Sequence, residues 1–155
     1  MFYSKLPYLS VIGGDIDPTK AKDYVGDYRA LPFRDKTFDA VIIDPPFIIG
    51  GSVGGPSTAY SSQYGRDPKP TSVLVDDYVK AALEGLRVAS KLVVIKCADM
   101  VNSGKFCPIA ARIIGRIGEP WDILITVREH TMTHPSWKSV QHFRHNYSYF
   151  LVYKL

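Results

Sequence analysis

The chain has 155 residues, with 46% hydrophobic and 22% charged residues and a formal net charge of +4 at pH 7. This length and balance predict a single globular domain, from residue 1 to residue 155, that is large enough to bury a hydrophobic core. A membrane-spanning protein is excluded, because no apolar run approaches the roughly 18–20 residues that cross a bilayer. The first residues have no signal-peptide pattern, and Cys97 and Cys107 lack metal-ligand spacing, so we expect a cytoplasmic protein.

Three short strands are predicted in the first part of the chain, and each leads to an acid. The strands are residues 8–12, 24–25 and 38–43, and the acids are Asp15, Asp27 and Asp44. The third strand contains a β-branched run, Val41-Ile42-Ile43, which is typical of a central strand buried on both faces. Two prolines then end it, because proline has no N–H for a sheet ladder.

Helices and strands alternate in the rest of the chain. We expect a Gly- and Pro-rich loop over residues 48–71, a helix over 72–89, a strand over 92–95, a loop over 97–104, a helix over 106–117 and strands over 121–127 and 147–153. Apolar residues that recur on one face indicate the first helix, and Pro108 would lie in the first turn of the second. The pattern predicts an α/β fold with a mostly parallel sheet that is closed by an antiparallel strand pair.

The most distinctive motif is Asp44-Pro45-Pro46-Phe47, directly after the third strand. Ligands of open α/β sheets bind just beyond the carboxyl ends of the strands. At that place the motif would hold a carboxylate, a backbone carbonyl and a flat ring in fixed geometry, which suits a nucleobase. The alternative is an ordinary proline turn whose aromatic ring packs in the core.

The three acids at strand ends favour a nucleotide-like cofactor. In one parallel sheet they would lie along one edge, where one aspartate could accept hydrogen bonds from both hydroxyls of a ribose and another from the amine of an adenine. A single aspartate after a strand is ordinary turn chemistry. We expect that structural role for four other aspartates, which are Asp17, Asp23, Asp35 and Asp39.

Three stretches resemble, in order and spacing, the class I S-adenosylmethionine-dependent methyltransferases. They are Gly14-Asp15-Ile16-Asp17-Pro18, residues 26–33, and Phe38-Asp39 leading into Asp44-Pro45-Pro46-Phe47. Within this family the chain resembles the amino-methyltransferases that modify adenine N6 or cytosine N4 in nucleic acids, over most of its length. The resemblance implies a Rossmann-like sheet. Only 14 residues precede Asp15, so we expect the family's first strand, with its Gly-rich turn, to be missing from the middle of that sheet.

The resemblance implies a cofactor and the residues that bind it. S-adenosylmethionine would be held through its ribose by Asp15, with Gly14 and Ile16 beside it. Its adenine would be held by Asp27, with Tyr28 and the neighbouring backbone.

The resemblance also implies the chemistry of the proline motif. Asp44 and the carbonyl of Pro45 would accept the protons of an exocyclic amine, and so aim its lone pair at the sulfonium methyl group. Pro46 would fix that carbonyl, and Phe47 would stack on a flipped base. This predicts methyl transfer to adenine N6, in DNA before RNA, with cytosine N4 as the other base.

Other residues are candidates for contact with the substrate. A basic and aromatic segment between the last two strands suits a phosphate backbone and a stacked base, and it contains Trp137, Lys138 and Arg144. Lys96 follows a buried strand and could face the substrate cleft. The alternative in each case is a solvated or paired surface residue. We expect no metal site, since the histidines lack cysteine or glutamate partners at ligand spacing.

Nucleic acid is the expected partner, and the positive charge permits it. The missing strand adds a second expectation, that a homo-oligomer or a partner subunit completes the sheet. Two other functions stay open from the sequence. One is a non-catalytic methyltransferase-like subunit that binds nucleic acid or supports an active partner. The other is a different nucleotide-binding α/β protein, for which the proline motif would be a coincidence.

Overall fold

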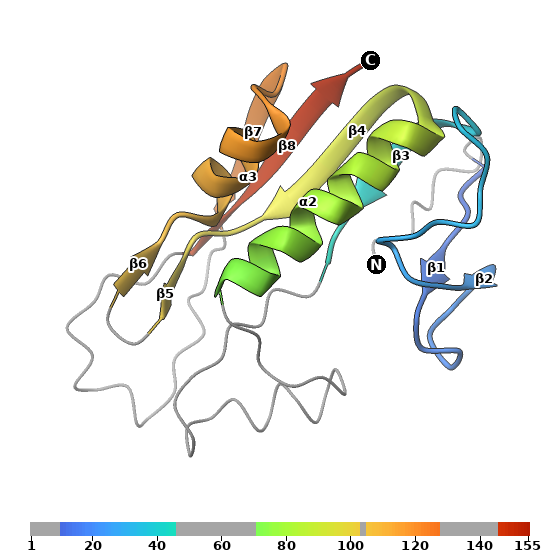
Figure 1. Cartoon of the computed structure of the whole chain (residues 1–155), viewed down its shortest axis with the longest axis horizontal. Helices are drawn as coiled ribbons and strands as arrows, with labels where there is room; N and C mark the ends of the chain where they lie inside the picture. The colour runs from blue at the N-terminus through green and yellow to red at the C-terminus, as the bar shows by residue number, and fades with distance from the viewer. Residues whose placement is uncertain (1–9, 46–70, 103–104, 128–145) are drawn as a thin grey trace.

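A computed structural model describes residues 10–45, 71–102, 105–127 and 146–155 of the chain. Its elements are β1 (Gly14–Asp15), β2 (Tyr24–Val25), β3 (Phe38–Ile43), α2 (Thr71–Val88), β4 (Ala89–Cys97), β5 (Met100–Asn102), β6 (Lys105–Cys107), α3 (Ile109–Ile117), β7 (Asp122–Val127) and β8 (Tyr147–Lys154). Strands and helices are mixed along the chain, so the predicted α/β class is confirmed (Figure 1).

Four strands form the main sheet, in the order β3-β4-β8-β7. β3 is parallel to β4, whereas β8 is antiparallel to both of its neighbours, β4 and β7. The antiparallel pair expected at the end of the chain is therefore confirmed. The main sheet as a whole is mixed, and parallel pairing within the described residues is limited to β1–β2 and β3–β4.

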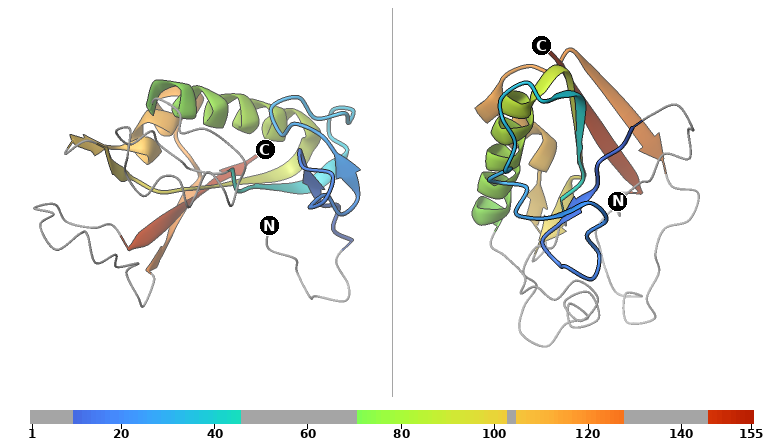
Figure 2. Two further views of the ribbon diagram at one scale, coloured as in Figure 1. Left: turned by 90° about the horizontal axis from the view of Figure 1, so that it is seen from below. Right: turned by 90° about the vertical axis from the view of Figure 1, so that its right-hand side faces the viewer.

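The core lies between one face of this sheet and the two helices, α2 and α3 (Figure 2). Side chains from both layers are fully buried there, and the largest are Tyr78, Val88, Val93, Ile95, Cys97, Ile109, Ile113 and Leu151. Full burial of an aliphatic side chain contributes about 1.5–3 kcal/mol. The packing of the helices on this face therefore holds β3 and β4 in place.

At Gly85, α2 lies close against the sheet. A Cβ added there would lie 2.7 Å from Cδ1 of Ile43 and 3.2 Å from Cγ1 of Val93. Glycine within a helix is about 1 kcal/mol less favourable than alanine. At this position it lets the helix backbone approach the end of β3, which is where the proline motif begins.

Several element boundaries differ from the sequence prediction. β4 runs from Ala89 to Cys97 rather than over residues 92–95, so Lys96 lies within this strand and not after it. The loop expected over residues 97–104 contains the end of β4 and all of β5, which pairs antiparallel with β6. The helix expected from Phe106 begins at Ile109, and Pro108 is its N-cap residue rather than part of its first turn. Because proline disfavours helical backbone in the residue before it, Cys107 stays extended in β6.

The first two strands correct a larger expectation. β1 is Gly14–Asp15 rather than residues 8–12, and residues 10–12 of that prediction lie outside any strand. β1 pairs in parallel with β2 as a separate two-stranded sheet, and no strand of the described residues joins it to β3. Asp15 and Asp27 therefore do not share one continuous sheet edge with Asp44, because the ladder is interrupted between β1 and β3.

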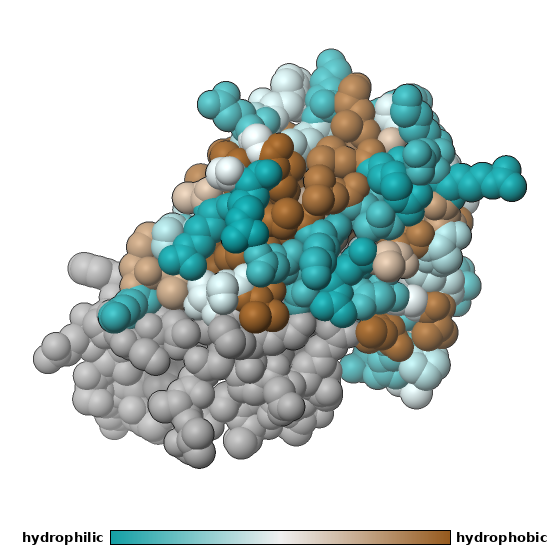
Figure 3. Space-filling view, viewed as in Figure 1, coloured by the Kyte–Doolittle hydropathy of each residue, from teal (hydrophilic) through white to brown (hydrophobic). Residues whose placement is uncertain are grey.

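The surface over α2 and α3 alternates between apolar and charged side chains (Figure 3). Leu83 on α2 is more than half exposed, while Tyr78 and Ala82 of the same helix are fully buried. This is the pattern of a helix with one face in the core and one in solvent. Neither described helix is long and apolar enough to cross a membrane.

Candidate functional site

The carboxyl ends of β3 and β4 bring together two residues that the sequence analysis selected separately. Ile43 pairs with Ile95 in the parallel ladder, so Asp44 and Lys96 follow the same rung on neighbouring strands. Oδ2 of Asp44 accepts a hydrogen bond from Nζ of Lys96 at 2.8 Å. The side chains are only 21% and 17% exposed, respectively. The strand register therefore builds a partly buried ion pair at the start of the proline motif.

Pro45, directly after Asp44, is buried. Because the proline ring fixes φ, it sets the direction of the chain as it leaves β3. The rest of the motif, Pro46 and Phe47, lies outside the described residues, as do Trp137, Lys138 and Arg144.

A buried phenol lies on the helix side of this corner. Tyr78 of α2 is fully buried, and its hydroxyl has no hydrogen-bond partner in the part of the chain that the structure describes. Burial raises the pKa of Tyr78 well above its usual value, and the nearby Cys97 and Asp44 raise it further. The phenol is therefore neutral and keeps its proton. An unsatisfied buried donor costs about 1–3 kcal/mol.

The small sheet places the predicted cofactor residues in two adjacent turns. Oδ1 of Asp15 accepts a hydrogen bond from the backbone N–H of Asp17 at 2.9 Å, and the carbonyl of Asp15 accepts one from Gly26 at 3.0 Å. Gly14 is required by packing, because a Cβ there would overlap the ring of Tyr24. Asp15 thus lies beside the turn that leads to Asp27.

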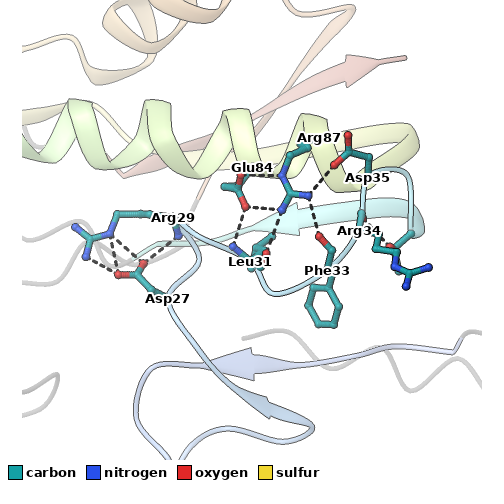
Figure 4. A network of polar contacts seen from close by, with 9 residues as sticks. Asp27, Arg29, Leu31, Phe33, Arg34, Asp35, Glu84 and Arg87 are labelled. Atoms are coloured by element: carbon teal, nitrogen blue, oxygen red, sulfur yellow. Dashed lines mark hydrogen bonds and ion pairs between the residues drawn. The ribbon is translucent and has the colours of Figure 1, made fainter.

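Asp27 accepts hydrogen bonds from three N–H groups of Arg29, one of which is shared between its two oxygens (Figure 4). Its Oδ1 accepts from the backbone N–H and from Nε of Arg29, and its Oδ2 accepts from Nε and Nη2 of the same residue. A carboxylate offers about four acceptor positions. Nη1 of Arg29 donates in addition to Asp77 of α2 at 2.7 Å. The bonds to Asp27, and then those to Asp77, raise the pKa of Arg29 above its usual value.

A second arginine continues this connection between α2 and the segment before β3. Arg87 donates to Glu84, to Asp35 and to the carbonyls of Leu31 and Phe33, and Glu84 accepts from the backbone N–H of Leu31 (Figure 4). The bond from Arg87 lowers the pKa of Glu84, and the Leu31 amide adds to it against the opposing effect of burial. The two arginines therefore hold residues 27–35 against the helix.

This pair of networks was missed by the sequence analysis. The only local signal is the spacing of Glu84 and Arg87, which are neighbours on one face of a helix. The partners of Arg29 and Arg87 across the chain depend on the fold.

The structure also describes the other predicted cofactor residues. Tyr28 packs on the core with the guanidinium of Arg29 over its ring at 5.9 Å, and Ile16 is exposed.

Four other aspartates make contacts within the chain, and of these four Asp17 alone does so in the kind of local turn that the sequence suggested. Asp17 accepts from Thr19, Asp23 accepts from the backbone N–H of Gly13, Asp35 pairs with Arg87 and Asp39 pairs with Lys91. Within the described ranges, no group of three histidine, cysteine, aspartate or glutamate side chains could hold a metal ion.

No family model matches the sequence, and no curated protein matches it. Solved structures do match. TTHA0409 from Thermus thermophilus, provisionally assigned as a DNA modification methylase, aligns with 84% of this chain at a TM-score of 0.53 and 17% sequence identity. The two proteins share a fold. A structure of TTHA0409 complexed with S-adenosyl-L-methionine aligns with 84% of the chain at a TM-score of 0.53 and 19% identity. The chain spans about half the length of TTHA0409, 52% and 53% in the two structures.

Proposed function

We propose that this chain is an S-adenosylmethionine-dependent methyltransferase that acts on an exocyclic amine of a nucleobase, with adenine N6 in DNA as its substrate. The main support is the position of Asp44 and Pro45, a carboxylate and a buried proline at the carboxyl end of a parallel strand. This is the place where open α/β sheets bind ligands. The shared fold with TTHA0409, and its complex with S-adenosyl-L-methionine, support the same proposal.

In this proposal the cofactor supplies a methyl group on a sulfonium, and the chain prepares the nucleophile. The amine of adenine is a weak nucleophile because its lone pair is delocalised into the ring. Asp44 and the carbonyl of Pro45 accept hydrogen bonds from its two N–H groups, which lets the nitrogen become pyramidal. The nitrogen would then bond to the methyl carbon as the carbon–sulfur bond breaks, with S-adenosylhomocysteine as the leaving group, and the proton that the nitrogen loses would go to water. Phe47 stacks on the base, worth about 1–3 kcal/mol.

The cofactor residues divide into two kinds in this proposal. Asp15 uses one carboxylate oxygen in its own turn and can offer the other to a ribose. Both carboxylate oxygens of Asp27 are engaged by Arg29, so we assign the contact with the adenine of the cofactor to the backbone of Asp27 and Tyr28. Arg29, which is bound by Asp77 of α2, then holds this backbone in place.

The proposal is tested by incubating the chain with labelled S-adenosylmethionine and with unmethylated DNA, RNA or mixed-sequence oligonucleotides. Digestion to nucleosides should show label in N6-methyldeoxyadenosine, and less in the RNA product. Label in N4-methyldeoxycytidine would show that the target base is cytosine and would leave the proposed type of reaction unchanged. If calorimetry shows that the cofactor binds but no nucleoside is labelled, the proposed methyl transfer to nucleic acid is contradicted. If the cofactor does not bind at all, the assignment as an S-adenosylmethionine-dependent methyltransferase is contradicted.

A second candidate is a methyltransferase-like subunit that becomes complete only with another chain or a second copy. The observation that favours it is the interruption between β1 and β3. Ile42 of β3 belongs to a run typical of central strands, yet it is 73% exposed. Light scattering with and without nucleic acid distinguishes the two candidates. Oligomers whose formation parallels methyl transfer favour this second candidate, and transfer by a monomer excludes it.

A further inference from the structure

The ion pair between Asp44 and Lys96 places a hydrogen-bond acceptor beside a hydrogen-bond donor at one end of the parallel ladder. The two atoms that meet are Oδ2 of Asp44 and Nζ of Lys96, 2.8 Å apart. Both side chains are mostly buried, so neither charge is fully solvated. Because β3 and β4 are in register up to Ile43 and Ile95, the order of the two groups is fixed by the sheet.

An aminated base presents the complementary pair along one edge. In adenine the N6 amine is a donor and the adjacent ring nitrogen N1 is an acceptor, and in cytosine N4 and N3 have the same relationship. Guanine and thymine present a carbonyl next to a ring N–H, which reverses the order. Enzymes that act on flipped bases select them by hydrogen bonds to this edge. An acceptor and a donor side by side therefore match the amine and ring nitrogen of adenine or cytosine, whereas guanine or thymine could bind them only when turned over, which brings a ring N–H and not an amine to Asp44.

We propose that Lys96 is a specificity-determining residue that reads the ring nitrogen next to the target amine. This inference rests on the proposed function, since it assigns the amine to Asp44. In the free protein the ammonium of Lys96 occupies Asp44 in place of the amine. When the base enters, Asp44 accepts from the amine and Lys96 turns to donate to N1 of adenine. The flexible four-carbon stem of lysine permits this small movement.

The exchange keeps every charged group bonded. Asp44 loses a hydrogen bond from Lys96 and gains one from the amine, while Lys96 loses Asp44 and gains the ring nitrogen. A base without that nitrogen leaves the ammonium with no partner on the substrate. A hydrogen bond to a charged group is worth about 1.5–3 kcal/mol, which is a factor of roughly 10 to 150 in rate.

The test combines one change in the substrate with one change in the protein. Oligonucleotides that contain adenine or 1-deazaadenine, which has C–H in place of N1, are compared for methyl transfer by the unmodified chain and by Lys96→Met. We expect the unmodified chain to lose about 10- to 100-fold in kcat/KM on 1-deazaadenine. Lys96→Met should lose a similar factor on adenine and show no further loss on 1-deazaadenine.

The control variant is Lys80→Met, which removes an exposed lysine of α2. It should keep the full discrimination between the two bases. Calorimetric titration with adenosine and 1-deazaadenosine, in the presence of S-adenosylhomocysteine, gives a second measurement that needs no turnover. Adenosine should bind more tightly than its analogue, and Lys96→Met should remove that difference.

Each outcome is decisive. Equal rates and equal affinities for the two bases in the unmodified chain would overturn the role of Lys96, and this comparison needs no variant to fold. Discrimination that persists in Lys96→Met would overturn it as well. Selective adenosine binding that depends on Lys96, without transfer to any oligonucleotide, would support the inference and reject the enzyme. Absence of adenosine binding would reject both.

Discussion

Arg29 joins two parts of the molecule that share no hydrogen-bonded strand among the described residues. It holds Asp27, after β2, through a bidentate contact, and it reaches Asp77 on α2 at 2.7 Å. Asp77 is buried, and β1–β2 belongs to a different sheet from β3. The position of the small sheet therefore depends on side chains that bind to a helix.

We expect Asp77→Asn to destabilise the protein by about 1.5–3 kcal/mol, because it removes the buried one of the two carboxylates that pair with Arg29 and leaves a polar group buried. The matched control is Asp76→Asn, the neighbouring residue, whose pair with Arg116 is about half exposed. Exposed pairs contribute about 0–1 kcal/mol. Urea denaturation measures both variants, and equal losses would show that the burial of Asp77 makes no difference.

The network at Glu84 predicts a dependence of stability on pH. Its pKa is lower in the folded chain than the value of 4.5 expected without partners, chiefly because Arg87 donates to it. Its contribution is therefore complete above about pH 5 and is lost as the pH falls through the folded pKa, where both states are protonated. The free energy of unfolding of the unmodified chain, minus that of Glu84→Gln, should shrink on acidification. A constant difference from pH 7 to pH 3 would contradict the charged pairing.

Two glycines on the helices should respond in opposite directions to alanine. Gly85→Ala should destabilise by about 1 kcal/mol, since overpacking against Ile43 and Val93 costs about 1–3 kcal/mol and exceeds the gain in helix propensity. Gly115→Ala on α3 meets nothing within 4 Å and should stabilise by about 0.5–1 kcal/mol. Thermal unfolding of the two variants gives the signs, and stabilisation by both would mean that α2 can move away from the sheet.

Burial should make one thiol inert. It raises the pKa of Cys97 to about 12, with a smaller contribution from Asp99. At pH 8 the thiolate is a very small fraction, and the side chain is also inaccessible. Labelling with iodoacetamide, followed by peptide mass spectrometry, should find Cys97 unmodified until denaturant is added. Rapid modification in buffer would show that the end of β4 opens readily.

The proposed division of roles predicts different defects in two aspartate variants. Asp44→Ala should abolish methyl transfer and leave calorimetric cofactor binding within about threefold, because the carboxylate contacts the target amine. Asp15→Ala should weaken cofactor binding by about 10-fold or more, the effect of losing hydrogen bonds to a charged acceptor. The same pattern of loss in both variants would contradict this division.

The sequence predicted the elements whose signals are local. The alternation of strands and helices, the antiparallel end of the sheet and the strand before Asp44 follow from apolar periodicity and from proline. The start of α3 was wrong by three residues, because the effect of Pro108 on the residue before it outweighed the helical pattern.

The predicted site was limited by contacts that no local pattern encodes. Lys96 was selected only as a residue after a buried strand. Its pairing with Asp44 depends on the register of β3 against β4, across 52 residues of sequence. The contact of Asp27 with Arg29 likewise depends on Asp77 of α2, which lies 48 residues further along the chain and binds the same arginine. A sequence reading can propose such residues, and only the fold decides which of them meet.

The place of β8 between β4 and β7 has a consequence for biosynthesis. β4 and β7 each pair with β8, which separates them in the sheet. On a ribosome, both would emerge with an open edge facing the position that β8 later fills. Apolar strands in that state are prone to aggregation. Completion of the sheet must await the synthesis of β8, and until then the edges of β4 and β7 stay open to other chains.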